Sequence, residues 1–140
     1  MVVVLDTNHF QELRENSIAG KRLAARIKQA RASVFSCIVA AEESLQGWLA
    51  FIHSRKNGLD QLEPYARLHA CIETLSNLTI LPFDDAAAVT FHSLQKQVRR
   101  VGPMDLKIAS VCLAYDATLL SRNLKDFEQV PGLRVENWLD

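Results

Sequence analysis

A run of three valines and a leucine, residues 2–5, ends directly on Asp6, Thr7 and Asn8. An uninterrupted apolar run of this length predicts a strand that is buried on both faces, as strands of a parallel sheet are. Three polar side chains therefore follow the carboxyl end of a buried strand. An aspartate at such a position is often only a turn former or a helix cap, so its role depends on what else reaches the same place.

Further apolar runs along the chain alternate with stretches of helical periodicity. Strands are expected at residues 2–5, 34–35, 78–81, 118–120 and about 133–135. Helices are expected at 18–30, 38–55, 60–76, from Asp84 to Val98, 104–115 and 124–127, with Asp60 and Asp84 as caps and Pro103 in a first turn. This alternation predicts an α/β fold with a mainly parallel sheet and helices on both faces. In such sheets ligands bind beyond the carboxyl ends of the strands, which is where Asp6 lies.

Size and composition limit the alternatives. A chain of 140 residues predicts one domain, 1–140. The formal net charge is zero, so binding to nucleic acid would require basic residues gathered on one face. Three widely spaced cysteines give neither a disulfide framework nor a metal motif and fit a reducing cytoplasm. No secretory signal is evident and no apolar stretch approaches the roughly 20 residues of a membrane span, so we expect a cytoplasmic protein with no membrane partner.

A second carboxylate is expected on the helix within SCIVAAEESLQGWLAFI, residues 36–52. Leu45, Trp48, Leu49 and Ile52 form an apolar stripe on this helix. Glu43 lies roughly opposite that stripe, on a face of small residues that suits close approach to another element (Gly47, Ala50 and Ser54). Glu42 lies near the edge of the stripe and is the expected solvent-facing glutamate.

Two more acidic positions occur in the last third of the chain. Asp105, in VGPMDLKIASVCLA, falls in the first turn of a helix, where the helix dipole alone would favour it. In LLSRNLKDF a predicted strand ends on Ser121, and Asn123 and Asp126 follow. This repeats the layout of the first strand, although serine and asparagine are also common turn residues.

The four segments LDTN, AEESLQG, GPMDLKIAS and LLSRNLKDF, in this order and at these separations, resemble the PIN domain, in particular the VapC-type toxin ribonucleases of bacterial toxin–antitoxin pairs. The resemblance covers almost the whole chain and implies a three-layer α/β fold with a sheet of four to five strands. By motif it identifies Asp6, Glu43 and Asp105 as the principal acids, with Asp126 and Asn123 as candidates for a fourth position. Thr7 and Asn8 match the polar pair after the first aspartate, and Ser121 stands where the family more often has threonine.

PIN domains are metal-dependent nucleases, so the resemblance implies Mg²⁺, with Mn²⁺ as a possible substitute, and an RNA substrate. Carboxylate ligands without histidine or cysteine suit these ions. Asp6, Glu43 and Asp105 would bind the metal directly or through water, and Asp126 would be an outer ligand. Supporting residues would be Thr7, Asn8, Ser121 and Asn123, and phosphate contacts would come from Lys107, Arg122 and Lys125. The resemblance also implies a small antitoxin protein and a homodimer, with the helical hairpin of residues 38–76 as an interface. The apolar stripe with Trp48 is a large apolar surface for a hairpin at the margin of a small sheet, so we expect Trp48 to anchor that interface unless the hairpin itself covers the stripe.

Other interpretations stay open at this stage. Haloacid-dehalogenase-like phosphatases also begin with an apolar strand and a nucleophilic aspartate, but they carry a second aspartate where this chain has Asn8. A catalytically silent PIN fold that only binds partners is a third class, and such domains usually lose acids that this chain retains. Lys107, Arg122 and Lys125 could equally belong to an ordinary solvated face. Among the four histidines, only His9 is expected near the site.

Overall fold

The computed structural model describes residues 1–140, and a five-stranded sheet in the order β3-β2-β1-β4-β5 lies at its centre. Every neighbouring pair of strands is parallel, and Val4 lies opposite both Phe35 and Leu119. The strands are β1 (Val2–Leu5), β2 (Ser33–Cys37), β3 (Thr79–Leu81), β4 (Thr118–Leu120) and β5 (Val135–Glu136). The helices are α1 (Thr7–Glu15), α2 (Ile18–Ala30), α3 (Ile38–Ser54), α4 (Leu62–Ser76), α5 (Asp85–Gln97), α6 (Pro103–Ala114) and α7 (Leu124–Phe127). The expected three-layer α/β fold with a parallel sheet is confirmed.

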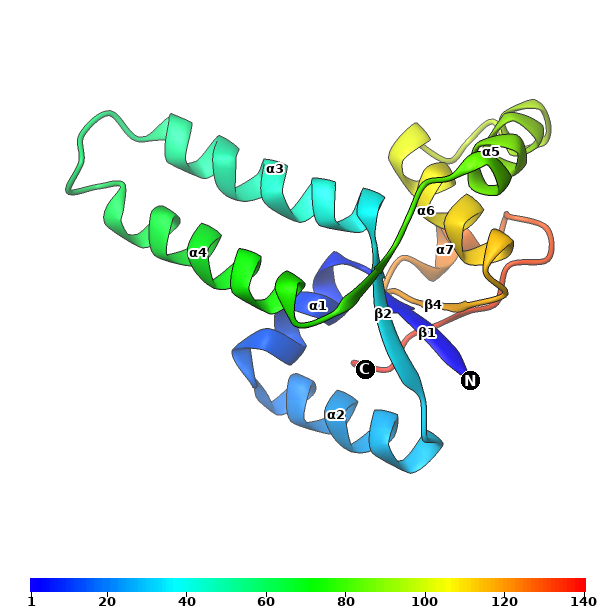
Figure 1. Ribbon diagram of the computed structural model, residues 1–140, viewed down its shortest axis with the longest axis horizontal. Helices are drawn as coiled ribbons and strands as arrows, with labels where there is room; N and C mark the ends of the chain where they lie inside the picture. Colours follow the sequence, from blue (N-terminus) through cyan, green and yellow to red (C-terminus); the bar gives the residue numbers. More distant parts are fainter.

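Two apolar clusters cover the two faces of the sheet, because successive side chains of a strand point to opposite faces. Val4 and Leu119 belong to the cluster that includes α5 and α6 residues. Val3, Leu5 and Leu120 belong to the cluster that includes Phe10 of α1 and Leu23 of α2. Figure 1 shows this division, with α5, α6 and α7 on one side of the strands and α1 and α2 on the other. Burial on both faces explains why β1 is apolar throughout.

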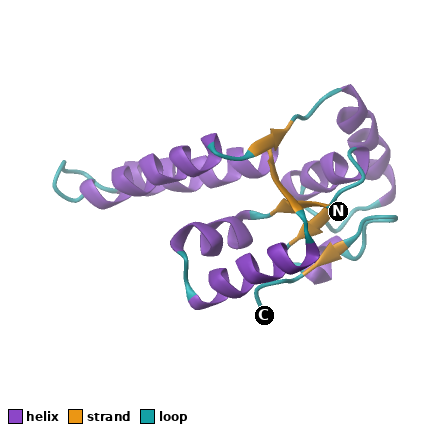
Figure 2. Ribbon diagram, turned by 60° about the horizontal axis from the view of Figure 1, so that its bottom comes forward, coloured by secondary structure: helices purple, strands orange, loops and turns teal.

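Helices α3 and α4 form a hairpin that projects from the body of the domain, as both Figure 1 and Figure 2 show. The buried residues of α3 lie mostly in its first two turns (Val39, Ala40, Ala41 and Ser44, with Ile52 farther along). Gly47, Ala50 and Ser54 are exposed, and a Cβ added at Gly47 would meet no atom within 4 Å. The expected close approach of this small-residue face to the domain body is therefore wrong, because the hairpin leaves the body where that face begins.

Trp48 is not the open anchor of the hairpin. Its side chain is half-buried against the apolar cluster that contains Phe10, and the Arg67 guanidinium lies 5.7 Å from its ring. Other apolar residues of the hairpin are more exposed, among them Leu49, Leu62, Tyr65 and Ile72. An interface on the hairpin would therefore be anchored by these residues.

The ends of the helices test the capping residues that the sequence predicted. Asp84 caps α5 by accepting from the Ala87 N–H, and Pro103 opens α6, both as predicted. Asp60 does not cap α4, because its backbone N–H donates to Asn57 in the preceding turn and the helix begins at Leu62. Helix α1 was not predicted, and Asp6 is its N-cap. No helix has the length and apolar character that crossing a membrane requires.

Candidate active site

The topology of the sheet places the candidate site beside β1. The chain moves from β1 to β2 and β3 on one side, and then returns to place β4 and β5 on the other. Open parallel sheets bind ligands at this reversal of strand order, beyond the carboxyl ends of the strands. Asp6 follows β1 and Ser121 follows β4 at this point, and the Asp6 N–H continues the ladder by donating to the Leu120 carbonyl at 3.0 Å.

Asp6 is held in place by both of its carboxylate oxygens. The Ser121 hydroxyl donates to Oδ2 at 2.8 Å, and the Thr7 backbone N–H donates to Oδ1 at 2.8 Å. Ser121 is itself fixed, because its oxygen accepts from the Asn123 N–H at 3.0 Å. Asp6 thus serves at once as helix cap and as a fixed carboxylate at the end of the strand, with 9% of its surface exposed.

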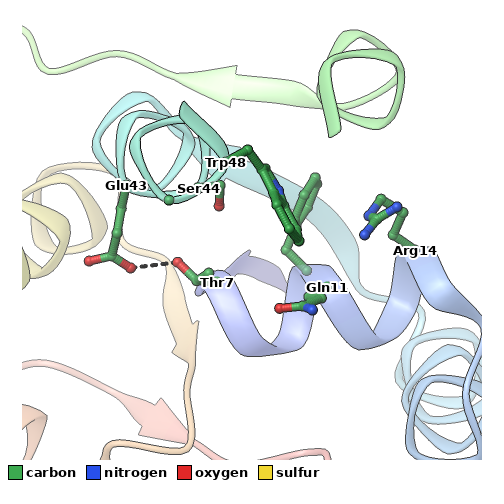
Figure 3. Close-up of a pocket in the computed structure, with 8 residues that line it drawn as sticks. Thr7, Gln11, Arg14, Glu43, Ser44 and Trp48 are labelled. Atoms are coloured by element: carbon green, nitrogen blue, oxygen red, sulfur yellow. Dashed lines mark hydrogen bonds between the residues drawn. The ribbon is translucent and has the colours of Figure 1, made fainter. Parts of the chain in front are cut away.

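Glu43 reaches the same place from the second turn of α3. The Thr7 hydroxyl donates to Glu43 Oε1 at 2.5 Å and so joins α3 to the first residue of α1 (Figure 3). Glu43 is half-buried, whereas Glu42 is exposed and lines a separate apolar groove on the other side of α3. The structure therefore brings Glu43, and not Glu42, to Asp6.

The last two acids are linked by Asn123. Its side-chain amide donates to Asp126 Oδ2 at 3.1 Å and, at 3.5 Å, points toward Asp105 Oδ2. Asp105 comes from the first turn of α6 and Asp126 from α7. Both candidates for the fourth position therefore lie at the site, with Asn123 between the two aspartates.

The charges of these acids act on one another. Burial and, to a smaller extent, the neighbouring charges of Asp6, Glu43 and Asp126 together raise the pKa of Asp105 to about 6. Burial also raises the pKa of Asp6, which the hydrogen bonds from Thr7 and Ser121 partly oppose, while the charge of Glu43 adds to the rise. A cluster that resists ionisation in this way is expected to bind a cation.

The oxygen donors are spread rather than closed around one point. As the side chains lie, no three histidine, cysteine, aspartate or glutamate side chains are placed to hold a metal ion together. Glu43 is turned to Thr7, and Asn123 lies between Asp105 and Asp126. A small divalent ion that keeps several of its own waters fits such a spacing, because water can bridge it to the outer carboxylates.

The remaining predicted residues lie differently. Asn8 and Lys125 are exposed, and Lys107 is half-buried with Nζ 5.6 Å from the Phe91 ring centre. Arg122 is paired with Asp140 through two nitrogens at 3.2 and 3.4 Å. Sequence reasoning missed the 137–140 segment, although Trp138 and Leu139 are buried against the layer of α1 and α2. Two large apolar residues this late in the chain were the available signal.

This fold, with acids converging at the strand ends, places the chain in a known family. The chain belongs to the PIN domain family, whose model matches residues 3–133. The predicted family is confirmed, and the haloacid-dehalogenase-like alternative is thereby wrong.

Among its relatives are bacterial VapC proteins. The chain is 31% identical over 81 residues to the tRNA(fMet)-specific endonuclease VapC of Salmonella typhimurium, a match that covers 55% of this chain and 61% of that protein. It is 38% identical over 87 residues to Ribonuclease VapC2 of Haemophilus influenzae, covering 59% and 66%. The matched part thus spans less than two thirds of either curated relative.

The fold also agrees with solved structures. The DNA-bound VapBC of Salmonella typhimurium matches with a TM-score of 0.76 over 99% of this chain and 98% of that chain, at 22% identity. At this level of identity the match concerns the arrangement of strands and helices.

Proposed function

We propose that this chain is a divalent-metal-dependent endoribonuclease that hydrolyses RNA phosphodiester bonds, and that it is the toxin of a toxin–antitoxin pair. The convergence of Asp6, Glu43, Asp105 and Asp126 at the reversal point of a PIN sheet is the observation that carries this proposal. The names of the curated relatives, ribonuclease and endonuclease, support it. A catalytically silent binding module would have no need of four mutually repelling carboxylates in one half-buried place.

We assign Mg²⁺ as the ion, with Mn²⁺ as a substitute. The donors at the site are carboxylate, hydroxyl and amide oxygens, and hard oxygen ligands suit these ions. Asp6, Glu43 and Asp105 would hold the ion directly or through water, and Asp126 would be an outer ligand. When bound, such an ion lowers the pKa of water and stabilises the negative charge that grows on the phosphate.

The other side chains fix the carboxylates for this task. Ser121 and the Thr7 backbone hold Asp6, the Thr7 hydroxyl holds Glu43, and Asn123 separates Asp105 from Asp126. Because Asp6, Glu43 and Asp105 are each oriented by a side chain from another element, the site depends on how β1, α1, α3, β4 and α6 pack together. These supporting contacts explain why polar residues cluster at the ends of two buried strands.

Phosphates of the RNA would approach from the side of Lys125 and Arg122, which follow β4 at the rim of the site. Lys125 is exposed and can reach a phosphate directly. Arg122 would have to exchange its partner Asp140 for a phosphate. Lys107, on the same helix as Asp105, is the third candidate.

We further propose a homodimer and a small antitoxin as protein partners. The exposed apolar residues of the α3–α4 hairpin support an interface there: Leu49 is 42%, Leu62 66%, Tyr65 55% and Ile72 50% exposed. The structural neighbour from Salmonella is a VapBC complex. A cytoplasmic location would agree with an RNA substrate and with the three buried, unpaired cysteines.

The test is cleavage of RNA by the purified protein with Mg²⁺, with Mn²⁺ and with chelator. A random-sequence single-stranded RNA and a total transfer RNA pool would serve as substrates. Asp6→Asn should abolish cleavage while circular dichroism stays unchanged, and Asp85→Asn, which removes an exposed acid of α5, should retain it. Cleavage that persists in chelator, or in the Asp6→Asn protein, would contradict the proposal.

A further inference from the structure

A pocket of about 240 Å³ lies between α1 and α3, next to the acidic site. Phe10 and Trp48 provide its aromatic walls, and Gln11 and Arg14 of α1 provide polar groups. Thr7 and Glu43 also line it, so the hydrogen bond between them separates the pocket from the other carboxylates. Whatever occupies the pocket would lie beside the place where the acids meet.

Arg14 lines this pocket, and one of its donor atoms has no hydrogen-bond partner. Its side chain is only 13% exposed, and Nη2 is buried with no hydrogen-bond partner. The nearest carboxylate, Glu15, is 3.5 Å from Nη2 but receives a shorter contact, at 2.8 Å, from Arg67. Buried donors in native proteins are nearly always paired, so an open one marks a place for an acceptor. Figure 3 shows the Arg14 guanidinium directed toward Trp48 across the pocket.

The orientation of Trp48 is set by its surroundings. The Arg67 guanidinium of α4 lies 5.7 Å from its ring centre, and Phe51 lies 6.3 Å from it in a tilted arrangement. The ring is thus fixed as a wall while it remains half-exposed. A fixed, half-exposed aromatic ring beside an open guanidinium suits a flat group that has both an aromatic face and hydrogen-bond acceptors on its edge.

Charge selects among such groups. Glu43 borders the pocket, and its carboxylate disfavours a phosphate or an acidic peptide side chain there. A nucleobase is neutral, stacks on aromatic side chains, and carries ring nitrogen and carbonyl acceptors that arginine can bind. The volume is enough for one base but not for a base pair.

We propose that this pocket binds a nucleobase of the RNA strand, next to the phosphodiester bond that is cut, with the base stacked on Trp48 and its acceptor edge on Arg14. The inference rests on the ribonuclease function proposed above and extends it to the recognition of the substrate. Gln11, whose amide donates to Glu15 at 3.3 Å, leaves its carbonyl oxygen available for a base amino group.

Binding can be measured without cleavage. The chain has two tryptophans, so Trp138, which is buried and whose indole donates to Glu136, serves as an internal control in nitrogen-15 spectra. Addition of adenosine, guanosine, cytidine or uridine should shift the indole signal of Trp48 and leave that of Trp138 in place. Inorganic phosphate should shift neither signal. Absence of a Trp48 response to all four nucleosides would overturn the inference.

Two variants test the assigned contacts. Trp48→Leu removes the stacking face, and Arg14→Gln removes the donor while keeping a similar length. Each should raise the KM for random-sequence single-stranded RNA on the order of tenfold, with kcat changed far less, because stacking on one aromatic side chain contributes about that much to binding. Arg26→Gln is the matched control, since Arg26 lies 4.7 Å from the Trp138 ring, away from the pocket, and it should leave KM unchanged.

The outcomes separate this inference from the proposed function. Nucleoside binding at Trp48 without any RNA cleavage would support the pocket and contradict the nuclease. Cleavage with an unchanged KM in both variants would support the nuclease and overturn the pocket. If the variants instead lose only a protein partner and keep the wild-type KM, the pocket belongs to that partner and the inference is wrong. Circular dichroism of both variants, compared with Arg26→Gln, excludes unfolding as the cause of a raised KM.

Discussion

The backbone N–H of Trp138 donates a 3.0 Å hydrogen bond to Nε2 of His9, across 129 positions of sequence. His9 lies in the helix that Asp6 caps, and its side chain is fully buried. Arg122, just after the end of β4, is paired with Asp140 in the same segment. The 137–140 segment therefore contacts residues just beyond both strand ends that carry Asp6 and Ser121.

This bond requires a neutral His9, which predicts a pH dependence of stability. Burial lowers the pKa of His9 from its ordinary 6.5 to about 4, with a smaller contribution from Arg122 that Asp140 opposes. Between these values the unfolded chain binds a proton that the folded chain does not, so stability is present above pH 6.5 and is lost as the pH falls toward 4. This pKa shift corresponds to a contribution of about 3 kcal/mol to the free energy of unfolding.

The matched variant is His9→Gln, which does not titrate and can still accept from the Trp138 N–H. Urea unfolding of both proteins in chelator, at steps from pH 7.5 to 4.5, isolates the contribution of His9. Wild-type stability should fall more steeply than that of His9→Gln over this range. Parallel pH profiles would show that His9 is not kept neutral by the fold.

A second prediction concerns two glycines that sit inside helices. A Cβ at Gly20 of α2 would lie 2.0 Å from the backbone oxygen of Glu12, because α1 and α2 meet there. Gly20→Ala should therefore lower the free energy of unfolding by about 1–3 kcal/mol or more, because the backbone must move to make room for the methyl group. Gly47→Ala, with open space around it, should be neutral or stabilising by up to about 1 kcal/mol, because alanine favours helix. Thermal unfolding of both variants checks the contrast, and equal effects would contradict it.

The strands could be predicted from the sequence because a parallel sheet is buried on both faces, so that β1 and β4 appear as apolar runs. The start of α5 could be predicted as well, because Asp84 is a side-chain cap and apolar residues at helical spacing follow it directly. Helix α1 was not predicted: a helix cap was one possible role for Asp6, but no helix was assigned to the residues that follow it. In α3, the small residues Gly47 and Ala50 were assigned to a contact, although the helix has left the domain body by then.

For the site, the meeting of Asp6 and Ser121 follows from the parallel sheet alone, since both end neighbouring strands. The positions of Glu43 and Asp105 depend on how α3 and α6 pack, which no local pattern specifies, and they were predicted through the family resemblance. The bond between His9 and Trp138 could not be predicted, because it joins residues near opposite ends of the sequence and neither belongs to a recognisable motif.

A third prediction distinguishes two adjacent glutamates. Glu43→Gln should lower kcat for RNA cleavage by at least about tenfold, because the amide loses the charge that would bind the ion while keeping its size. Glu42→Gln should have little effect, since Glu42 is exposed and faces the groove beside Lys107. Initial rates at saturating RNA and Mg²⁺ provide the comparison. An inactive Glu42 variant beside an active Glu43 variant would reverse the assignment of this helix.

The last prediction links the acids to stability through Asp105. Its pKa is raised to about 6 by burial and by the charges of Asp6, Glu43 and Asp126, so the ionised carboxylate destabilises the metal-free fold at neutral pH. Asp105→Asn removes that charge and should stabilise the metal-free protein by about 1–2 kcal/mol. Mg²⁺ or Mn²⁺ should raise the melting temperature of the wild type by mass action and should do so much less in the variant.

The control is Asp85→Asn, which removes the charge of an exposed acid on α5 and should keep the full response to metal. An Asp105→Asn protein that is less stable in chelator, or that responds to Mg²⁺ as the wild type does, would show that Asp105 does not share a cation with the other acids.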